Sequence, residues 1–262
     1  MNKILSACCA LSLVCAFDAS AAGPQEGAFS WSLSGGVDSP LSGDVHDGAI
    51  APVADLGPLN PALAGVSAEL RIRPRDHDDI YGSARSLGLE FGYGLSERSE
   101  IFGQVRFTRA DEGSVQVGGA FVPALSTTLP IRGTFGDYDA LTIEGGYRHY
   151  FADLGPTRPF VAGRIGATRT DAIRATFEIP DAAITIANVP FTQDTWSASA
   201  GIDLGLLIPI GERFGLVAQT GVRYVADLDG DDSAIGGLGL SGINDTGKRV
   251  SYPVSVGLRM DF

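Results

Sequence analysis

Beyond its first fifteen residues, the chain contains no cysteine. Of its 262 residues only three are cysteines, and these are Cys8, Cys9 and Cys15. An exported protein whose mature part lacks cysteine has to be stable without disulfide bonds. Long hydrophobic runs are also missing after residue 21, because no stretch there reaches the roughly 18 apolar residues that a membrane-spanning helix needs. The sequence therefore does not predict a transmembrane helix.

Basic residues are scarce as well. The chain has 19 lysines and arginines against 31 aspartates and glutamates, which gives a formal net charge of −12. A charge of this sign argues against a nucleic acid as the partner. The hydrophobic content of 44% is too high for a solvated coil, and 35 glycines among short alternating segments indicate an all-β protein with many tight turns.

The first residues, 1–21, have the pattern of a secretory signal peptide. Lys3 precedes an apolar run over 4–17, and small residues follow up to Ala21. The run is too short to cross a bilayer as a helix, and the small residues are typical of a cleavage site. We predict cleavage after Ala21 or Ala22.

The rest of the chain, 22–262, contains segments in which apolar and polar residues alternate. A period of two is typical of a β-strand with one apolar and one polar face. Eight such segments lie at 29–37, 86–95, 100–109, 140–151, 160–169, 196–210, 214–225 and 250–262.

The connections between these segments alternate in length. Short turns lie at 96–99, 152–159 and 211–213. Long polar segments rich in Gly and Asp lie near 38–82, 110–139, 170–195 and 226–249. Short periplasmic turns and long extracellular loops are the asymmetry of an outer-membrane barrel. We therefore predict that 22–262 forms one closed, antiparallel transmembrane β-barrel.

The strand number has an alternative. Segment 66–73 alternates as well as any of the eight, and adding it alone would give nine strands and break the asymmetry of the two rims. Adding 113–122 too would give ten. We predict eight strands, with ten as the alternative.

The apolar faces carry no charge in the middle of their strands, and their aromatic residues gather near the strand ends. Two aromatic girdles around an uncharged apolar band are what the two interfaces of a membrane favour. The predicted interface aromatics are Tyr93, Phe107, Phe151, Trp196, Phe214, Tyr224 and Tyr252.

The opposite faces are polar and hold charges of both signs. An eight-stranded barrel is only wide enough for side chains to fill it, and unpaired ions there would be costly. We therefore predict a buried network of ion pairs; the alternative is a narrow, water-filled path lined by arginine. The predicted lumen residues are Glu90, Arg106, Glu144, Arg148, Arg164, Asp203, Arg223 and Arg259.

The hairpin "LGLEFGYGLSERSEIFGQVRF" and the ending "SYPVSVGLRMDF" resemble the small outer-membrane β-barrel proteins of Gram-negative bacteria, of the OmpA/OmpX/OmpW-like superfamily. The resemblance implies export through the periplasm to the cell outer membrane. It also implies that the barrel-assembly machinery reads the terminal alternating residues, and that the peptidoglycan-binding domain of OmpA-type members is missing here. The residues implied as the assembly signal are Val254, Val256, Leu258, Met260 and Phe262.

Such a location makes outer-membrane lipids and lipopolysaccharide the expected partners. Arg85, Arg109 and Arg169 lie at the outer ends of their strands with outward parity, where arginine could meet lipopolysaccharide phosphates. The same placement is also expected if these arginines only extend their charged ends toward the polar headgroups, without a specific ligand.

Two acidic clusters each contain some, but not all, of the residues that a metal site or a catalytic site would need. Asp227, Asp229 and Asp231 begin like a calcium loop, but the glycine and glutamate that such a loop needs at positions 6 and 12 are absent. Asp76, His77 and Asp79 resemble the rim groups of an outer-membrane protease, without a second matching cluster.

His149, the only histidine in a predicted strand, has no serine at a spacing that would make a lipase-type pair. We therefore predict no enzyme, no cofactor and no metal site. The expected role is structural or surface interaction, with extracellular loops on display. The alternatives are a narrow porin-like channel and, third, an outer-membrane enzyme.

Overall fold

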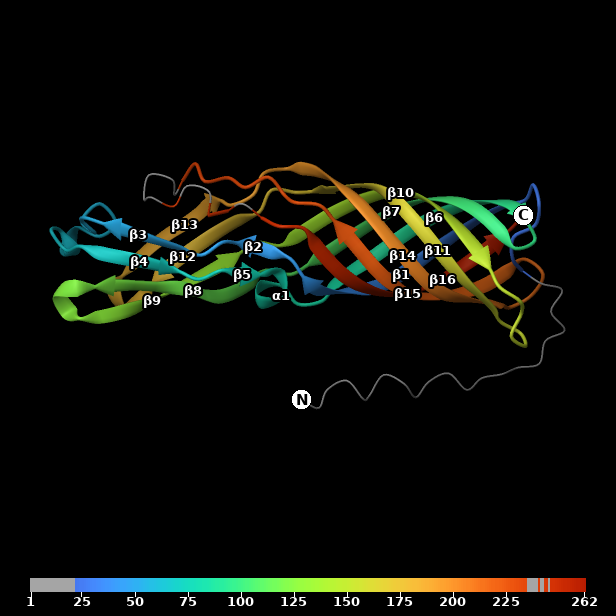
Figure 1. Ribbon diagram of the computed structural model, residues 1–262, viewed down its shortest axis with the longest axis horizontal. Coiled ribbons are helices and arrows are strands. Elements are labelled where there is room, and N and C mark those ends of the chain that lie inside the picture. Colours follow the sequence, from blue (N-terminus) through green and yellow to red (C-terminus); the bar gives the residue numbers. More distant parts are fainter. Residues whose placement is uncertain (1–21, 235–239, 241–242, 245) are drawn as a thin grey trace.

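The computed structural model describes residues 22–234, 240, 243–244 and 246–262 (Figure 1). The predicted signal peptide, 1–21, lies outside the described residues and stays a prediction. The molecule is elongated, with a β-barrel at one end and a smaller β-sheet at the other.

The barrel is closed and antiparallel, and its strands follow the order β1-β16-β15-β14-β11-β10-β7-β6. These eight strands are β1 (Phe29–Ser42), β6 (Ala84–Ser96), β7 (Ser99–Ala110), β10 (Tyr138–Tyr150), β11 (Arg158–Thr170), β14 (Thr195–Pro209), β15 (Phe214–Val225) and β16 (Arg249–Asp261). The first and last strands pair over most of their length, from Ser30 opposite Asp261 to Ser42 opposite Val250. The barrel therefore has no free edge, and the predicted eight-stranded transmembrane barrel is confirmed.

The long connections are more ordered than the sequence indicated. Six strands in them form a separate sheet, in the order β13-β12-β9-β8-β4-β3, beyond the outer end of the barrel (Figure 1). They are β3 (Ala49–Val53), β4 (Ala68–Ile72), β8 (Gly113–Val122), β9 (Thr127–Phe135), β12 (Arg174–Ile179) and β13 (Ile184–Pro190). We call residues 43–83, 111–137, 171–194 and the described part of 226–248 the head.

Segments 66–73 and 113–122 are thus strands, but they belong to the head and not to the barrel. This corrects the prediction that the connections near 38–82, 110–139 and 170–195 are polar loops. Period-two alternation is the same whether the apolar face meets lipid or a protein core, so it could not tell a barrel strand from a head strand. The count of eight holds, and the alternative of ten is wrong.

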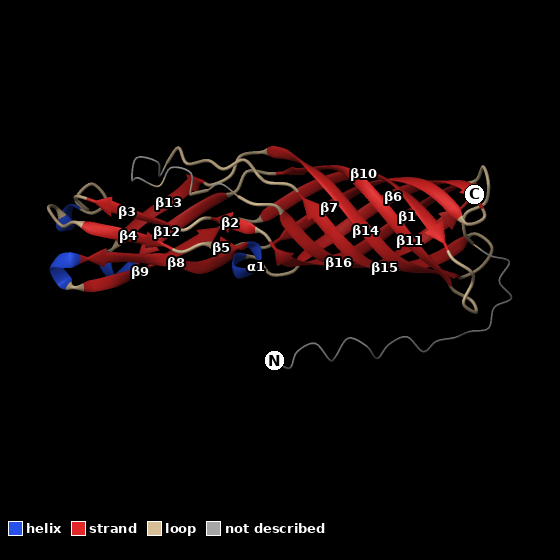
Figure 2. Ribbon diagram, in the orientation of Figure 1, coloured by secondary structure: helices blue, strands red, loops and turns tan. Residues whose placement is uncertain are grey.

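The remaining elements are short and lie at the tip of the head and at its junction with the barrel (Figure 2). They are β2 (Asp44–His46), β5 (Arg75–Asp76), α1 (His77–Ile80), η1 (Pro61–Leu63), η2 (Pro123–Leu125) and η3 (Pro180–Ala182). No helix in the described part of the chain is long and apolar enough to cross a membrane.

The head has its own hydrophobic core. Side chains from several of its strands meet there, and an edge-to-face pair of Phe135 and Phe191 has its ring centroids 4.9 Å apart. Leu70, Val117 and Ile131 are buried in the same core. Because this apolar surface is removed from solvent without any help from lipid, the head is stabilised as an aqueous domain is.

The barrel has the opposite arrangement, with large apolar side chains on its outer surface. Ile165 in β11 is 73% exposed, and its neighbours Ile143 and Ile202 on the adjoining strands are exposed too. Apolar residues cover the outer face of every barrel strand, a continuous area far larger than a water-soluble monomer tolerates. The outer face is therefore built to meet lipid.

This inversion predicts that a charge has different effects at two equally exposed isoleucines. Ile165→Arg should lower the free energy of unfolding by about 2–4 kcal/mol, because the substitution places an ion near the middle of the hydrocarbon. Ile50→Arg, at a residue that is 72% exposed on the head, should have little effect. Denaturant unfolding of the protein in lipid vesicles measures the free energy of unfolding of both variants. An equal loss at the two positions would contradict the conclusion that Ile165 faces lipid while Ile50 faces water.

Candidate functional site

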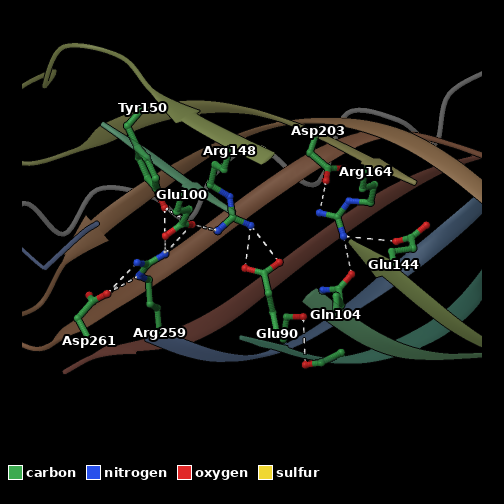
Figure 3. A network of polar contacts seen from close by, with 12 residues as sticks. Glu90, Glu100, Gln104, Glu144, Arg148, Tyr150, Arg164, Asp203, Arg259 and Asp261 are labelled. Carbon is green, nitrogen blue, oxygen red and sulfur yellow. Dashed lines mark hydrogen bonds and ion pairs between the residues drawn. The ribbon is translucent and has the colours of Figure 1, made fainter. Parts of the chain in front are cut away.

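A carboxylate, Glu100 of β7, is the centre of an ion cluster in the half of the lumen away from the head (Figure 3). It is fully buried and accepts hydrogen bonds from Arg148 at 2.5 Å, from Arg259 at 2.8 Å and from the hydroxyl of Tyr150 at 3.0 Å. These partners come from β10 and β16, so the cluster joins strands on different sides of the barrel. Charge-assisted hydrogen bonds of this kind are the strong ones in proteins.

The two arginines of this cluster also bind other acids. Arg148 donates to Glu90 at 3.0 Å, and Arg259 donates to Asp261 at 2.8 Å. The guanidinium of Arg148 also lies against the rings of Phe102 and Phe160, 4.7 Å from each centroid. Two of its donor nitrogens and part of its flat surface are therefore occupied by protein groups.

A second cluster lies further out along the lumen, around Arg164 of β11. This guanidinium donates to Gln104 at 2.5 Å and to Asp203, and it lies 3.6 Å from Glu144. Asp203 also accepts two hydrogen bonds from Arg223, at 2.5 and 3.0 Å. Two arginines therefore share one carboxylate, in an arrangement closed to solvent on every side.

The inward face also contains an apolar layer, which the sequence analysis missed. Phe102, Tyr150, Phe160, Leu207 and Val217 pack together as a buried cluster inside the barrel. The prediction of a purely polar inward face is therefore corrected. The alternation of side chains along the strands could have revealed this layer. Phe102 lies two residues from Gln104 and Phe160 lies four from Arg164, so both rings are on the same inward face as those polar residues.

All eight predicted lumen residues point inward, and each takes part in an ion pair. The pairs not yet described include Arg106 with Asp38, at 2.5 Å. Further charged residues of the lumen went unrecognised in the sequence: Asp38, Glu100, Arg249 and Asp261. Each shares the inward parity of its strand, so a strict count by parity would have found them.

The side chains of the Asp76–Asp79 segment make local contacts that stabilise the structure around α1. Asp76 and Asp79 form a capping box at the start of α1, in which each side chain accepts from the backbone of the other. His77 is half-buried, and its ring lies against those of Tyr81 and Tyr138, with centroids 4.8 and 5.3 Å away. Burial and the nearby Arg249 lower the pKa of His77 to about 3, so the imidazole is neutral at physiological pH.

The other candidate chemical groups also have local roles. Asp229 accepts from the hydroxyl of Thr195, and Asp231 accepts from the backbone of Ser233. Among the described residues, no three acidic, histidine or cysteine groups come together as a metal site would require. His149 lies against Phe151, with ring centroids 5.5 Å apart.

The seven predicted interface aromatics are all exposed on the outer face of the barrel or at its rim. The terminal alternating residues Val254, Val256, Leu258 and Phe262 are exposed there too, and Met260 is half-buried. Contact with the membrane interfaces and recognition by the assembly machinery stay predictions.

Two of the three rim arginines have acidic partners in the head. Arg109 pairs with Asp137 and, at 3.6 Å, with Asp139. Arg169 pairs with Asp194 at 3.1 Å. A lipopolysaccharide phosphate would have to compete with these carboxylates, and the partnership stays a prediction.

No family model matches the chain, and no curated protein sequence matches it. Among solved structures, it is similar to Neisserial surface protein A, with 14% identity, a TM-score of 0.42 and coverage of 90% of this chain and 100% of that one. It is also similar to OprG of Pseudomonas aeruginosa, with 17% identity, a TM-score of 0.38 and coverage of 92% and 98%. A third similar structure is the outer membrane protease OmpT of Escherichia coli, with 9% identity, a TM-score of 0.43 and coverage of 93% and 99%.

The barrel itself carries the assignment of location. A closed antiparallel sheet with an uncharged apolar outer band and a charged interior is one of the few ways in which a chain can satisfy its backbone in lipid. The chain has the fold of the small outer-membrane β-barrel proteins, and its location is the cell outer membrane.

Proposed function

We propose that this protein is a plugged outer-membrane barrel whose head is an interaction surface outside the cell. The observation that carries this proposal is the filled lumen. The two ion clusters and the apolar layer occupy it with side chains that are almost without contact to solvent. A solute could pass only if several charge-assisted hydrogen bonds broke together.

The head supports the other half of the proposal. Its six-stranded sheet and its own hydrophobic core hold the exposed residues in fixed positions, which reduces the entropy lost when a partner binds. The head is also tied across its tip, where the side chain of Asn60 donates to the backbone of Ala182 at 2.9 Å.

The head also concentrates the negative charge of the protein. Its segments carry about three times as many acidic as basic residues, while most of the acids and arginines of the lumen are paired with one another. A surface of one sign attracts partners of the opposite sign and speeds their association, most strongly at low salt. The proposed partner is therefore a positively charged molecule or surface.

Planar-bilayer recording tests the plugged lumen. The wild-type protein should give no conductance steps, because the ion clusters block the path. A variant with Glu100→Ala, Arg148→Ala and Arg259→Ala removes one acidic and two basic side chains together with much side-chain volume, and it should conduct. Steady, uniform steps from the wild-type protein would overturn the proposal in favour of a narrow porin-like channel.

Unfolding measurements test whether the cluster around Glu100 holds the barrel together. Glu100→Gln leaves two buried arginines without their shared carboxylate and should lower the free energy of unfolding by about 3–5 kcal/mol. Glu97→Gln, in the exposed turn at the same end, is the control and should change it by less than about 0.5 kcal/mol. Equal effects of the two substitutions would mean that the cluster adds no stability.

Adhesion assays test the charge of the head. Cells that display the full protein should bind a polylysine-coated surface better than cells that display Asp111→Asn with Glu112→Gln, two exposed head positions. The difference should shrink as salt is added, because salt screens exposed charges. Binding that neither salt nor these substitutions alter would contradict a cationic partner.

A further inference from the structure

A small polar cavity lies at the junction of the barrel and the head. Its volume is about 60 Å³, and its wall includes Arg106, Arg223 and Arg249 from three barrel strands. His77 of α1, Tyr138 of β10 and Asp38 of β1 complete the charged and titratable lining. A buried water needs only about 10–15 Å³, so the cavity has room for a small polyatomic guest.

Two of the three arginines have carboxylate partners. Arg106 pairs with Asp38 at 2.5 Å, and Arg223 pairs with Asp203 at 2.5 Å. Among the described residues, no acidic side chain forms an ion pair with Arg249. Its guanidinium donates only a long hydrogen bond, of 3.4 Å, to the hydroxyl of Thr170, and it lies 4.8 Å from the ring centroid of Tyr138.

Arg249 is nevertheless buried. It is 8% exposed, and its Nε and Nη1 atoms are closed to solvent without an acceptor in the described protein. Arginine does not lose its proton in proteins, so this side chain cannot escape the cost of burial by becoming neutral. A buried, unpaired ion is strongly destabilising, which means that a negative charge has to come from outside the described protein.

Other hydrogen-bond donors in the cavity wall are also buried without an acceptor. The Nε atoms of Arg106 and Arg223 and the hydroxyl of Thr108 are buried and have no protein acceptor. The Oδ1 atom of Asp38 is an unmatched acceptor, while its other oxygen accepts from Arg106, and the Nε2 atom of His77 is also buried without a partner. His77 adds no charge, since its low pKa keeps it neutral. After the two ion pairs are formed, the lining retains one positive charge, that of Arg249.

We infer that this cavity binds one small monovalent anion, of the size of chloride or acetate, with Arg249 as its principal ligand. One negative charge neutralises the lining, and the buried N–H donors supply the hydrogen bonds that a desolvated anion needs. Larger anions such as gluconate are too big for the volume. The site goes beyond the proposed role of the head, which requires no ligand in the barrel.

Thermal unfolding of the full-length protein in uncharged detergent tests the site. A ligand that binds only the folded state raises Tm with its concentration. At constant sodium concentration, replacing gluconate with chloride or with acetate should raise the Tm of the wild-type protein, and the two arms show which anion is preferred. Arg249→Gln should lose this rise.

The matched control is Arg169→Gln, which removes the same charge from an exposed arginine on the rim. It should keep the full chloride-dependent rise in Tm. An equal response from wild type and Arg249→Gln would overturn the site, since the effect would then be one of general ionic strength. This result is independent of the conductance measurement, so the plugged barrel can stand while the anion site fails.

Crystals of the wild-type protein soaked in sodium bromide provide a second measurement, which does not depend on whether Arg249→Gln folds. Anomalous scattering should place one bromide in the cavity, within hydrogen-bond distance of the Nε or Nη1 atom of Arg249. Well-ordered cavity walls without a bromide peak would overturn the proposal. Bromide peaks scattered only over surface arginines would do the same, because they would mean adventitious binding.

Discussion

The structure depends on one constraint, that backbone N–H and C=O groups have no water to bind inside a lipid bilayer. A sheet satisfies them only when it closes on itself, as the pairing of β1 with β16 does here. Closure fixes the parity of every barrel strand, because successive side chains must face lipid or lumen alternately. The apolar outer band and the charged interior are both consequences of this single geometric requirement.

The same constraint also limits which side chains the interior of the barrel can hold. Eight strands leave only enough space for side chains, so every charge inside has to find its partner among the other inward residues. Glu100 and Asp203 meet this demand by accepting from two arginines each. Among the described residues Arg249 is the exception, because near the outer end of the barrel it lines a cavity and has no carboxylate partner in that part of the chain.

The sequence predicted the barrel well because its strongest signal, period-two alternation without central charges, is also the physical requirement for a lipid-facing strand. It predicted most of the inward set by the same logic, but not Glu100 and Arg249, which lie at the ends of their strands. The head was not predicted, because alternation in 66–73 and 113–122 does not reveal what solvent the apolar face meets. The pairing of particular ions was also beyond the sequence, since it depends on the register between strands far apart in the chain.

The short links between the two sheets have a mechanical consequence. Only two residues separate β7 from β8 and β9 from β10, and three separate β11 from β12. Such links have almost no slack, so a force applied to the tip of the head passes directly into the barrel strands along their own axes. Hydrogen bonds across the wall then share the load in shear, and the embedded cylinder acts as a rigid footing for whatever is attached above it.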